Sequence, residues 1–156
     1  MLLVWYLLRE QTNDANESIF FNVKKGGVIM FLIDKDTKQI HCTRGDYGII
    51  DVSSINEDGS DYEFQKDDVV RFKVFKKKDC GCVEIQKDTI VNETSTVVKV
   101  ELEKKDTKIG ELINKPTDYW YEVELNPDTR PKTIICYDKQ GEKLFTLYPE
   151  GADKEW

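Results

Sequence analysis

Polar and apolar residues alternate along short stretches of this chain. The alternation is clearest at 118–126, which reads Asp-Tyr-Trp-Tyr-Glu-Val-Glu-Leu-Asn. One side of the two-residue period is apolar and holds Tyr119, Tyr121, Val123 and Leu125. The other side is polar apart from Trp120, and this pattern predicts a half-buried β-strand. Because proline cannot donate to a sheet ladder, Pro116 and Pro127 mark the two ends of this central strand.

The same pattern predicts further short strands along most of the chain. They lie at 30–33, 39–42, 48–55, 69–76, 82–86, 96–103, 133–137 and 143–148. Outside the central strand, the apolar positions expected in the core are Val70, Phe72, Val98, Val100 and Leu102. Turn-forming residues at 34–38 and 138–141 predict that the first two strands form a hairpin and that the last two form another.

One segment breaks the strand pattern. Asp106 is a candidate helix cap with apolar residues three apart after it, which predicts a short helical turn near residues 106–112. Seven to nine short strands, regularly spaced turns and one helical turn predict an all-β fold, an immunoglobulin-like antiparallel β-sandwich. In such sandwiches a tyrosine anchors the crossing between the sheets through its hydroxyl, and Tyr119 and Tyr121 are the candidates.

Residues 1–29 follow neither the strand nor the helix period. We expect them to be an N-terminal extension outside a β-sandwich domain of residues 30–151, with 152–156 as a tail. Back-translation of 25–30, Lys-Gly-Gly-Val-Ile-Met, with A-rich codons gives a GGAGG just upstream of an ATG. That is the arrangement from which bacterial ribosomes start. We therefore interpret Met30 as the native start and 1–29 as leader sequence or a misassigned start.

The charge and hydropathy of the chain argue against two classes of partner. Charged residues make up 34% of the 156 residues and the formal net charge is −7, which disfavours binding to nucleic acid because that requires clustered lysines and arginines. The one candidate membrane segment, 1–8, is far shorter than the roughly 20 apolar residues that span a bilayer. It also lacks the flanks of a secretory signal, so we expect neither membrane insertion nor secretion.

Four cysteines are present: Cys42, Cys80, Cys82 and Cys136. We interpret them as free, structural thiols in a reducing compartment, because disulfide frameworks belong to short secreted chains. A zinc site built from His41, Cys42 and the 80–82 pair is the alternative. The Cys-x-Cys spacing departs from that of zinc knuckles and no second pair exists, so we expect no metal and no cofactor.

The candidate catalytic groups have simpler structural interpretations. His41 and Cys42 are adjacent on a predicted strand and point to opposite faces, so they cannot form a dyad with each other. Glu122 and Glu124 share a face, as charged residues on a solvated sheet do. The Arg-Gly-Asp tripeptide at 44–46 is interpreted as turn chemistry. Because no nucleophile elbow, phosphate loop or metalloprotease motif is present, we expect no catalytic residues and no enzyme activity.

Aromatic side chains are the remaining candidates for binding. Trp120, Tyr137 and Tyr47 are the residues that we expect to contribute, because tryptophan and tyrosine are favoured anchors at interfaces. Several exposed aromatic side chains together would form a platform for a protein or a sugar. Two interpretations of Trp120 stay open: an anchor on the charged face of the central strand, or a core residue packed in the opposite sheet.

Short motifs follow one another in a fixed order between residues 44 and 151. They are Arg44-Gly45-Asp46, FQKDDVVRF at 64–72, DTKI at 106–109, YWYEV at 119–123 and KTI at 132–134. In this order the chain resembles the small immunoglobulin-like domains of tail, baseplate and fibre proteins from phages and prophages of low-GC Gram-positive bacteria. The resemblance is greatest to the N-terminal domain of the baseplate upper protein family.

The resemblance implies a non-enzymatic, virion-associated structural or interaction protein, such as a tail or baseplate accessory. Its partners would be other phage structural proteins or further copies of itself, and it would lie in the virion, or in the host cytoplasm before assembly. A free sheet edge would be a natural docking surface. The alternative function is a carbohydrate-binding module that uses exposed aromatic residues, and a thiol or metal protein is a third possibility.

Overall fold

The computed structural model describes residues 31–77, 81–110, 114–136, 141 and 143–150. Within them the chain forms nine strands and one short helix. In chain order these are β1 (Phe31–Ile33), β2 (Ile40–Thr43), β3 (Gly48–Val52), β4 (Val69–Phe75), β5 (Val83–Ile90), β6 (Val98–Leu102), α1 (Lys104–Thr107), β7 (Thr117–Leu125), β8 (Lys132–Ile135) and β9 (Leu144–Tyr148). The predictions for 1–29, Cys80, Tyr137 and 152–156 fall outside the described residues.

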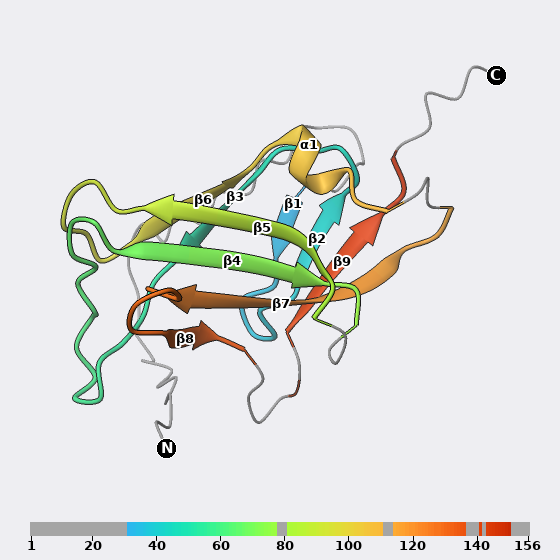
Figure 1. Cartoon of the computed structure of the whole chain (residues 1–156). Helices are drawn as coiled ribbons and strands as arrows, with labels where there is room; N and C mark the ends of the chain where they lie inside the picture. The colour runs from blue at the N-terminus through green and yellow to red at the C-terminus, as the bar shows by residue number, and fades with distance from the viewer. Residues whose placement is uncertain (1–30, 78–80, 111–113, 137–140, 142, 151–156) are drawn as a thin grey trace.

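The strands form two sheets that pack face to face as an all-β sandwich (Figure 1). The larger sheet has the order β1–β2–β9–β7–β4–β5, and β8 also pairs with β7. The smaller sheet consists of β3 and β6. Within the larger sheet, β4, β7 and β9 are neighbours in the order of strands C, F and G of an immunoglobulin-like sandwich, and β3 pairs with β6 as strand B pairs with E.

The pairing of β2 with β9 departs from the prediction of an antiparallel sandwich. These two strands are parallel, with Ile40 opposite Phe145 and Thr43 opposite Tyr148. The six other pairings among the described strands are antiparallel. Parallel neighbours need a long connection, and nearly the whole domain lies between β2 and β9 in the chain. Alternation along a strand predicts which face a side chain occupies, but not the direction of the neighbouring strand.

The last two strands do not form the predicted hairpin. Along one edge of β7, β9 pairs with Thr117–Trp120 and β8 pairs with Val123–Leu125 (Figure 1). Between these segments the backbone N–H of Tyr121 donates to the carbonyl oxygen of Lys143 at 3.0 Å. β8 and β9 therefore follow each other along the same edge, because the long central strand offers ladder positions to both.

The helical turn exists, but it begins at Lys104 rather than at Asp106. The carboxylate of Asp106 accepts a hydrogen bond of 2.8 Å from the backbone N–H of Glu103, so Asp106 lies within the turn and bonds back to its start. Gly110 follows with a φ of +68°, a left-handed conformation that helices do not continue through. The predicted short helical turn is therefore confirmed, but it begins two residues earlier than predicted, and positions 111–112 of the predicted span lie outside the described residues.

Tyr119 rather than Tyr121 lies at the corner between α1 and β7. Its hydroxyl is 3.4 Å from the place that a Cβ on Gly110 would take, so a glycine there lets the tyrosine approach the turn. Burial, together with the nearby carboxylate of Glu84, raises the pKa of the Tyr119 phenol. Tyr121 instead donates to the carbonyl oxygen of Lys38, in the turn between β1 and β2.

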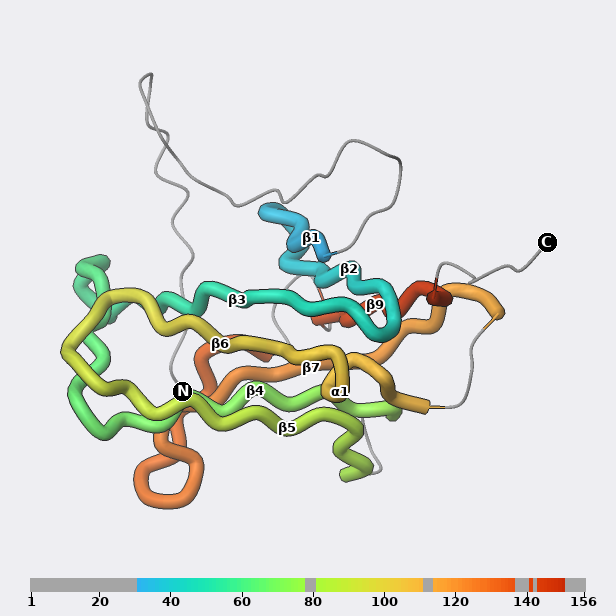
Figure 2. Tube along the Cα trace, turned by 90° about the horizontal axis from the view of Figure 1, so that it is seen from above, coloured from blue at the N-terminus to red at the C-terminus, as the bar shows by residue number. Residues whose placement is uncertain are grey.

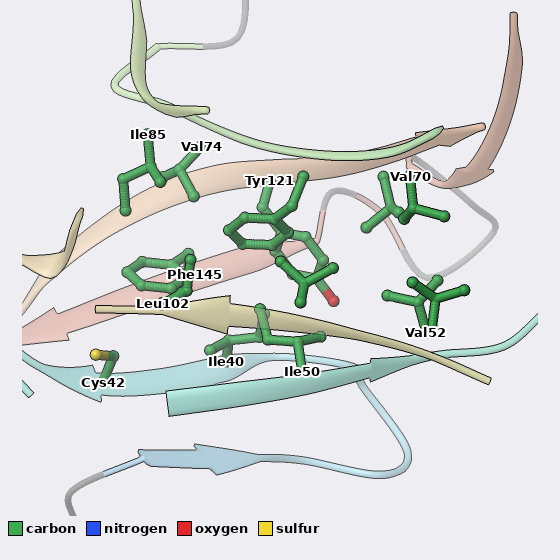
Figure 3. Close-up of a cluster of buried hydrophobic side chains, with 14 of the residues drawn as sticks. Ile40, Cys42, Ile50, Val52, Val70, Val74, Ile85, Leu102, Tyr121 and Phe145 are labelled. Carbon is green, nitrogen blue, oxygen red and sulfur yellow. The ribbon is translucent and has the colours of Figure 1, made fainter. Parts of the chain in front are cut away.

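The core lies between the two sheets, where side chains from both point toward one another (Figure 3). All nine positions predicted to be buried are buried: Val70, Phe72, Val98, Val100, Leu102, Tyr119, Tyr121, Val123 and Leu125. Strands β2 and β9 add further fully buried residues, which are Ile40, Cys42, Phe145 and Leu147. The two-residue period therefore predicted the inner faces of β4, β6 and β7 correctly.

At the two edges of the larger sheet, β1 lies close to β3 and β5 lies close to α1 (Figure 2). At the β1 edge, the ring of Phe31 lies against Gly48 of β3, and a Cβ on that glycine would be 2.2 Å from the ring. At the β5 edge, Lys87 Nζ lies 2.8 Å from the carboxylate of Asp106 in α1.

Candidate interaction face

Four apolar side chains form a row across the outer face of the larger sheet. Leu144 of β9 is opposite Trp120 of β7. Phe75 of β4 is opposite Trp120 on one side and opposite Val83 of β5 on the other. Three of these side chains are half-buried and Val83 is 41% exposed. We call these four residues the Trp120 row.

Trp120 points away from the core. Its neighbours Tyr119 and Tyr121 are 4% and 5% exposed on the inner face, and successive residues of a strand point to opposite faces. Phe75 likewise follows the fully buried Val74. The interpretation of Trp120 as a core residue of the opposite sheet is therefore wrong, and Trp120 lies on the charged face of β7.

Sequence reasoning identified Trp120 but missed the other three residues of the row. Phe75 could have been found, because it continues the outward-facing period of β4. Leu144 and Val83 could not, because the residues that lie opposite one another depend on strand order and register. An extra residue in β5, Glu84, also shifts the register between Val74–Ile85 and Phe75–Val83.

Lys73 lies beside the row on the same face of β4. Its Nζ is 2.6 Å from Glu122 and 2.9 Å from Glu124, both on β7, and 5.5 Å from the ring centre of Phe75. Burial opposes the charged form, but the hydrogen bonds to the two glutamates outweigh it and raise the pKa of Lys73. The ammonium group is thus held over the aromatic ring, where a cation–π attraction adds to the ion pairs.

Arg71 lies two positions earlier on β4 and is held on two sides. Its Nε and Nη2 donate to the two oxygens of Asp88, both at 2.7 Å, and its Nη1 and Nη2 donate to Asp128 at 3.1 and 3.0 Å. The bonds from Arg71 lower the pKa of Asp88 below its ordinary value. Such two-pronged pairs fix the geometry of the guanidinium group, although exposure to solvent weakens their effect on stability.

Together these charged residues give the face an acidic side. We call them the carboxylate ladder: Arg71, Lys73, Asp88, Glu122, Glu124 and Asp128. Two cations against four carboxylates leave a net charge of −2. The ladder borders the Trp120 row on the side toward the C-terminal end of β7.

A chain of hydrogen bonds borders the row on its other side. Gln39 Nε2 donates to Thr146 Oγ1 at 2.7 Å, and Thr146 Oγ1 donates to the carboxylate of Asp118 at 2.6 Å. Thr146 is only 5% exposed, so its hydroxyl needs partners within the protein. Gln39 and Asp118 provide them. Polar groups with fixed partners therefore flank the apolar row on both sides.

Of the three aromatic residues predicted to bind, Tyr47 and Trp120 lie on different sheets. Tyr47 precedes β3 and is 53% exposed, and Ile49, two residues later on the outward side of β3, is 40% exposed. These side chains belong to the smaller sheet, whereas Trp120 faces outward from the larger one. Tyr137 lies outside the described residues.

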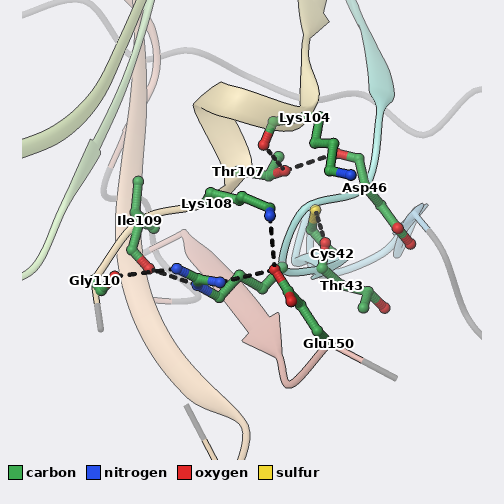
Figure 4. Close-up of polar contacts among 10 residues, drawn as sticks. Cys42, Thr43, Asp46, Lys104, Thr107, Lys108, Ile109, Gly110 and Glu150 are labelled. Atoms are coloured by element: carbon green, nitrogen blue, oxygen red, sulfur yellow. Dashed lines mark hydrogen bonds and ion pairs between the residues drawn. The ribbon is translucent and has the colours of Figure 1, made fainter. Parts of the chain in front are cut away.

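The Arg-Gly-Asp tripeptide is built into the structure (Figure 4). Arg44 Nη1 lies 2.8 Å from Glu150, and Arg44 Nε donates to the carbonyl oxygen of Ile109 at 3.3 Å. Only 13% of the Arg44 side chain is exposed. Gly45 has a φ of +86°, and a Cβ there would be 3.1 Å from both Glu150 and Lys108. Arg44 therefore links the segment after β9 to the turn before β7. This agrees with the interpretation of the tripeptide as a structural turn.

Asp46, the third residue of the tripeptide, joins the same cluster. Its carbonyl oxygen accepts a hydrogen bond of 2.8 Å from Thr107 Oγ1 of α1, as Figure 4 shows. Burial and the charge of Glu150 raise the pKa of its carboxyl group, and Lys104 opposes this shift.

His41 and Cys42 lie on opposite faces of β2. His41 Nδ1 is 3.0 Å from the hydroxyl of Tyr148 on the outer face. Cys42 is fully buried, and burial followed by the charge of Asp46 raises the pKa of its thiol to about 12. In the part of the chain that the structure describes, no group of three or more His, Cys, Asp or Glu side chains could hold a metal ion.

Comparisons with known proteins add no relative. No protein-family model matches the chain, and no curated protein or solved structure matches it either. Among the described residues, no helix is both long enough and apolar enough to cross a membrane.

Proposed function

We propose that this chain is a non-enzymatic structural or interaction protein associated with a phage or prophage virion, an accessory of the tail or baseplate. It acts through protein–protein contacts made by the outer face of the larger sheet. The observation that carries the proposal is the Trp120 row, an apolar strip across four strands of this face, flanked by ion pairs on one side and by a chain of hydrogen bonds on the other.

The dimensions of the row suit a protein partner. Neighbouring strands are about 4.8 Å apart, so the three gaps between Leu144 and Val83 span about 14 Å. A central aromatic side chain with a polar rim is the usual anatomy of an interface. The ion pairs of Lys73 and Arg71 hold the rim in place before binding, so a partner has less side-chain entropy to remove.

The virion assignment rests on the resemblance of the sequence motifs between residues 44 and 134 to those of phage tail and baseplate domains. The tripeptide at 44–46 leads into β3, and the segment 64–72 leads into β4. The motif at 106–109 begins in α1, and the aromatic motif at 119–123 lies within β7. On this proposal the partners are other virion structural proteins or further copies of the chain.

Site-specific photo-crosslinking tests this function with a matched pair of positions. A photoreactive residue replaces Val83 in the row, or Ile49 on the smaller sheet, which is equally exposed at 40% against 41%. Crosslinking in the producing bacterium during phage induction, followed by mass spectrometry, should link position 83 and not position 49 to virion proteins. Crosslinks at 49 alone, or at neither position, would overturn the interface. Crosslinks from 83 to metabolic enzymes would overturn the virion assignment.

Carbohydrate binding is the second candidate, because Trp120 lies between the carboxylates of Asp118 and Glu122 on the same strand face. A half-exposed indole beside hydrogen-bond acceptors can stack on a sugar ring and bind its hydroxyl groups. Glycan-array binding that Trp120→Ala abolishes and Tyr47→Ala leaves intact would favour this function over the first.

A further inference from the structure

The charges around the Trp120 row point to the chemistry of its partner. Resting on the proposed function, we infer that the row takes a cationic protein segment in extended conformation. This segment places one aliphatic or aromatic side chain on the row and lysine or arginine side chains two and four positions away, over the carboxylate ladder.

Carboxylates outnumber cations in the carboxylate ladder. Lys73 contacts one oxygen of Glu122 (Oε1) and one of Glu124 (Oε2). One ammonium group therefore faces two carboxylates, and the three groups together carry a net charge of −1. A partner cation therefore finds two acceptors that are already held in position and only partly neutralised. Carboxylate oxygens accept charge-assisted hydrogen bonds from lysine and arginine, which are stronger than neutral ones.

The same charges disfavour a second copy of the chain as the occupant. The ladder carries a net charge of −2 and the whole chain carries −7, so two copies repel each other as they approach. A cationic partner is instead drawn to this face and associates faster at low ionic strength.

The spacing of the face specifies the pattern of the partner. Trp120, Glu122 and Glu124 lie on one face of β7 at every second residue, which is about 6.6–6.8 Å per step. The side chains of an extended partner repeat at the same interval. One apolar residue and two cations at alternate positions therefore match the three residues of β7, in either chain direction.

The face also has a polarity. On the side of the row away from the ladder, β7 offers one carboxylate, Asp118, which already accepts a hydrogen bond of 2.6 Å from Thr146. Lys76 and Lys77 also follow Phe75 on that side, so a partner cation there would meet fewer acceptors than it meets over Glu122 and Glu124. The cations of the partner therefore lie on one side of its apolar residue only.

Peptide titrations of the full chain, labelled with ¹⁵N and followed by NMR, test this inference. The probe carries one phenylalanine, with lysines two and four positions after it, in a serine–threonine background. Matched probes carry glutamates in place of the lysines, or lysines one and three positions after the phenylalanine. The first probe should shift the indole signal of Trp120 and bind at least about tenfold more tightly than either control. Its affinity should fall about fivefold or more between 50 and 300 mM salt, because exposed charges are screened.

Paired protein variants locate the effect. Glu122→Gln with Glu124→Gln should weaken binding of the lysine probe about tenfold. Asp51→Asn with Glu101→Gln, which changes the net charge equally on the smaller sheet, should leave it unchanged. Equal weakening by both pairs, or equal affinity for all probes, would overturn the inference. Absence of any shift with the lysine probe, while crosslinks at position 83 persist, would overturn the cationic partner and leave the interface standing. If neither the NMR shift with the lysine probe nor the crosslinks at position 83 are observed, the proposed function itself is overturned.

Discussion

The hydroxyl of Tyr121 donates a hydrogen bond of 2.5 Å to the carbonyl oxygen of Lys38, which links the central strand to the turn of the first hairpin. Lys38 has a φ of +62°, a conformation that few non-glycine residues adopt. In the same turn, Lys143 Nζ lies 3.4 Å from the carbonyl oxygen of Thr37. The ring of Tyr121 packs against Phe72 with centroids 5.6 Å apart. One side chain thus serves both the core and the β1–β2 turn.

These two roles of Tyr121 can be separated by mutation. Tyr121→Phe keeps the ring and loses the hydroxyl, so the free energy of unfolding should fall by about 1 kcal/mol, the usual value of one hydrogen bond. Tyr121→Ala also removes the buried ring and should cost about 3–5 kcal/mol. Urea titrations followed by tryptophan fluorescence measure both. An alanine variant that loses less than about 1 kcal/mol would contradict the packing described for β7.

Gly48 and Phe31 should show strong energetic coupling. A Cβ on Gly48 would lie 2.2 Å from the Phe31 ring, so Gly48→Ala forces the ring off β3 and should cost about 1–3 kcal/mol. Phe31→Ala removes the three atoms that would lie nearest to the added methyl group, so the double variant should be more stable than the sum of the single losses predicts. A double-mutant cycle from urea melts measures this coupling.

The control for that cycle is Asp51→Ala, at an exposed position of the same strand, which should change stability by no more than about 0.5 kcal/mol. Strict additivity of the Gly48 and Phe31 variants would show that β1 does not pack on β3 as described.

The fold was predictable from sequence wherever local pattern decides the outcome. Tyr119 and Tyr121 were expected on the inner face and lie there, because successive residues of a strand must point to opposite sides. The pairing of β9 with both β2 and β7 was not predictable. The sequence of β9 would fit beside any neighbouring strand. Which strands it pairs with depends on contacts with segments far away in the chain.

The candidate site follows the same division. Trp120 stood out because it interrupts the polar side of the central strand. Its two cross-strand neighbours, Leu144 and Phe75, come from segments on either side of β7 in the sheet and far apart in the sequence. The strand register places them beside the indole of Trp120. The sequence alone therefore identified one candidate residue, and the folded structure was needed to identify the row.

The cysteines should differ in reactivity in the native protein. Cys136 is exposed, whereas Cys42 is fully buried and its pKa is raised to about 12, so Cys42 has almost no thiolate near neutral pH. Brief treatment with iodoacetamide, followed by peptide mass spectrometry, should modify Cys136 and spare Cys42. After unfolding, all four cysteines should react without a reductant. Modification of Cys42 as fast as Cys136, or only two reactive thiols in the unfolded chain, would contradict this.

Two aspartates should give stability profiles of opposite sign with pH. Burial and Glu150 raise the pKa of Asp46 above its ordinary value of 3.8. The folded state therefore binds this proton more tightly than the unfolded state. As pH rises from about 3.8 through the raised pKa, the wild type loses the stability that the protonated form contributes. Asp46→Asn removes this titration, so the variant should gain stability relative to the wild type as pH rises from about 3.5 to 7.

Asp58 provides the opposite case, because hydrogen bonds from the hydroxyl and backbone N–H of Ser60 lower the pKa of its carboxyl group below 3.8. Its contribution is present above pH 3.8 and is lost as pH falls through the lowered pKa. Asp58→Asn should therefore be the less stable protein near neutral pH and approach the wild type as pH falls. Urea melts of the three proteins at a series of pH values compare the two slopes directly. Slopes of the same sign for the two variants would show that the Asp46 carboxyl is not held in the buried corner beside Glu150, and that the C-terminal side of β9 does not pack against the turn before β3 as described.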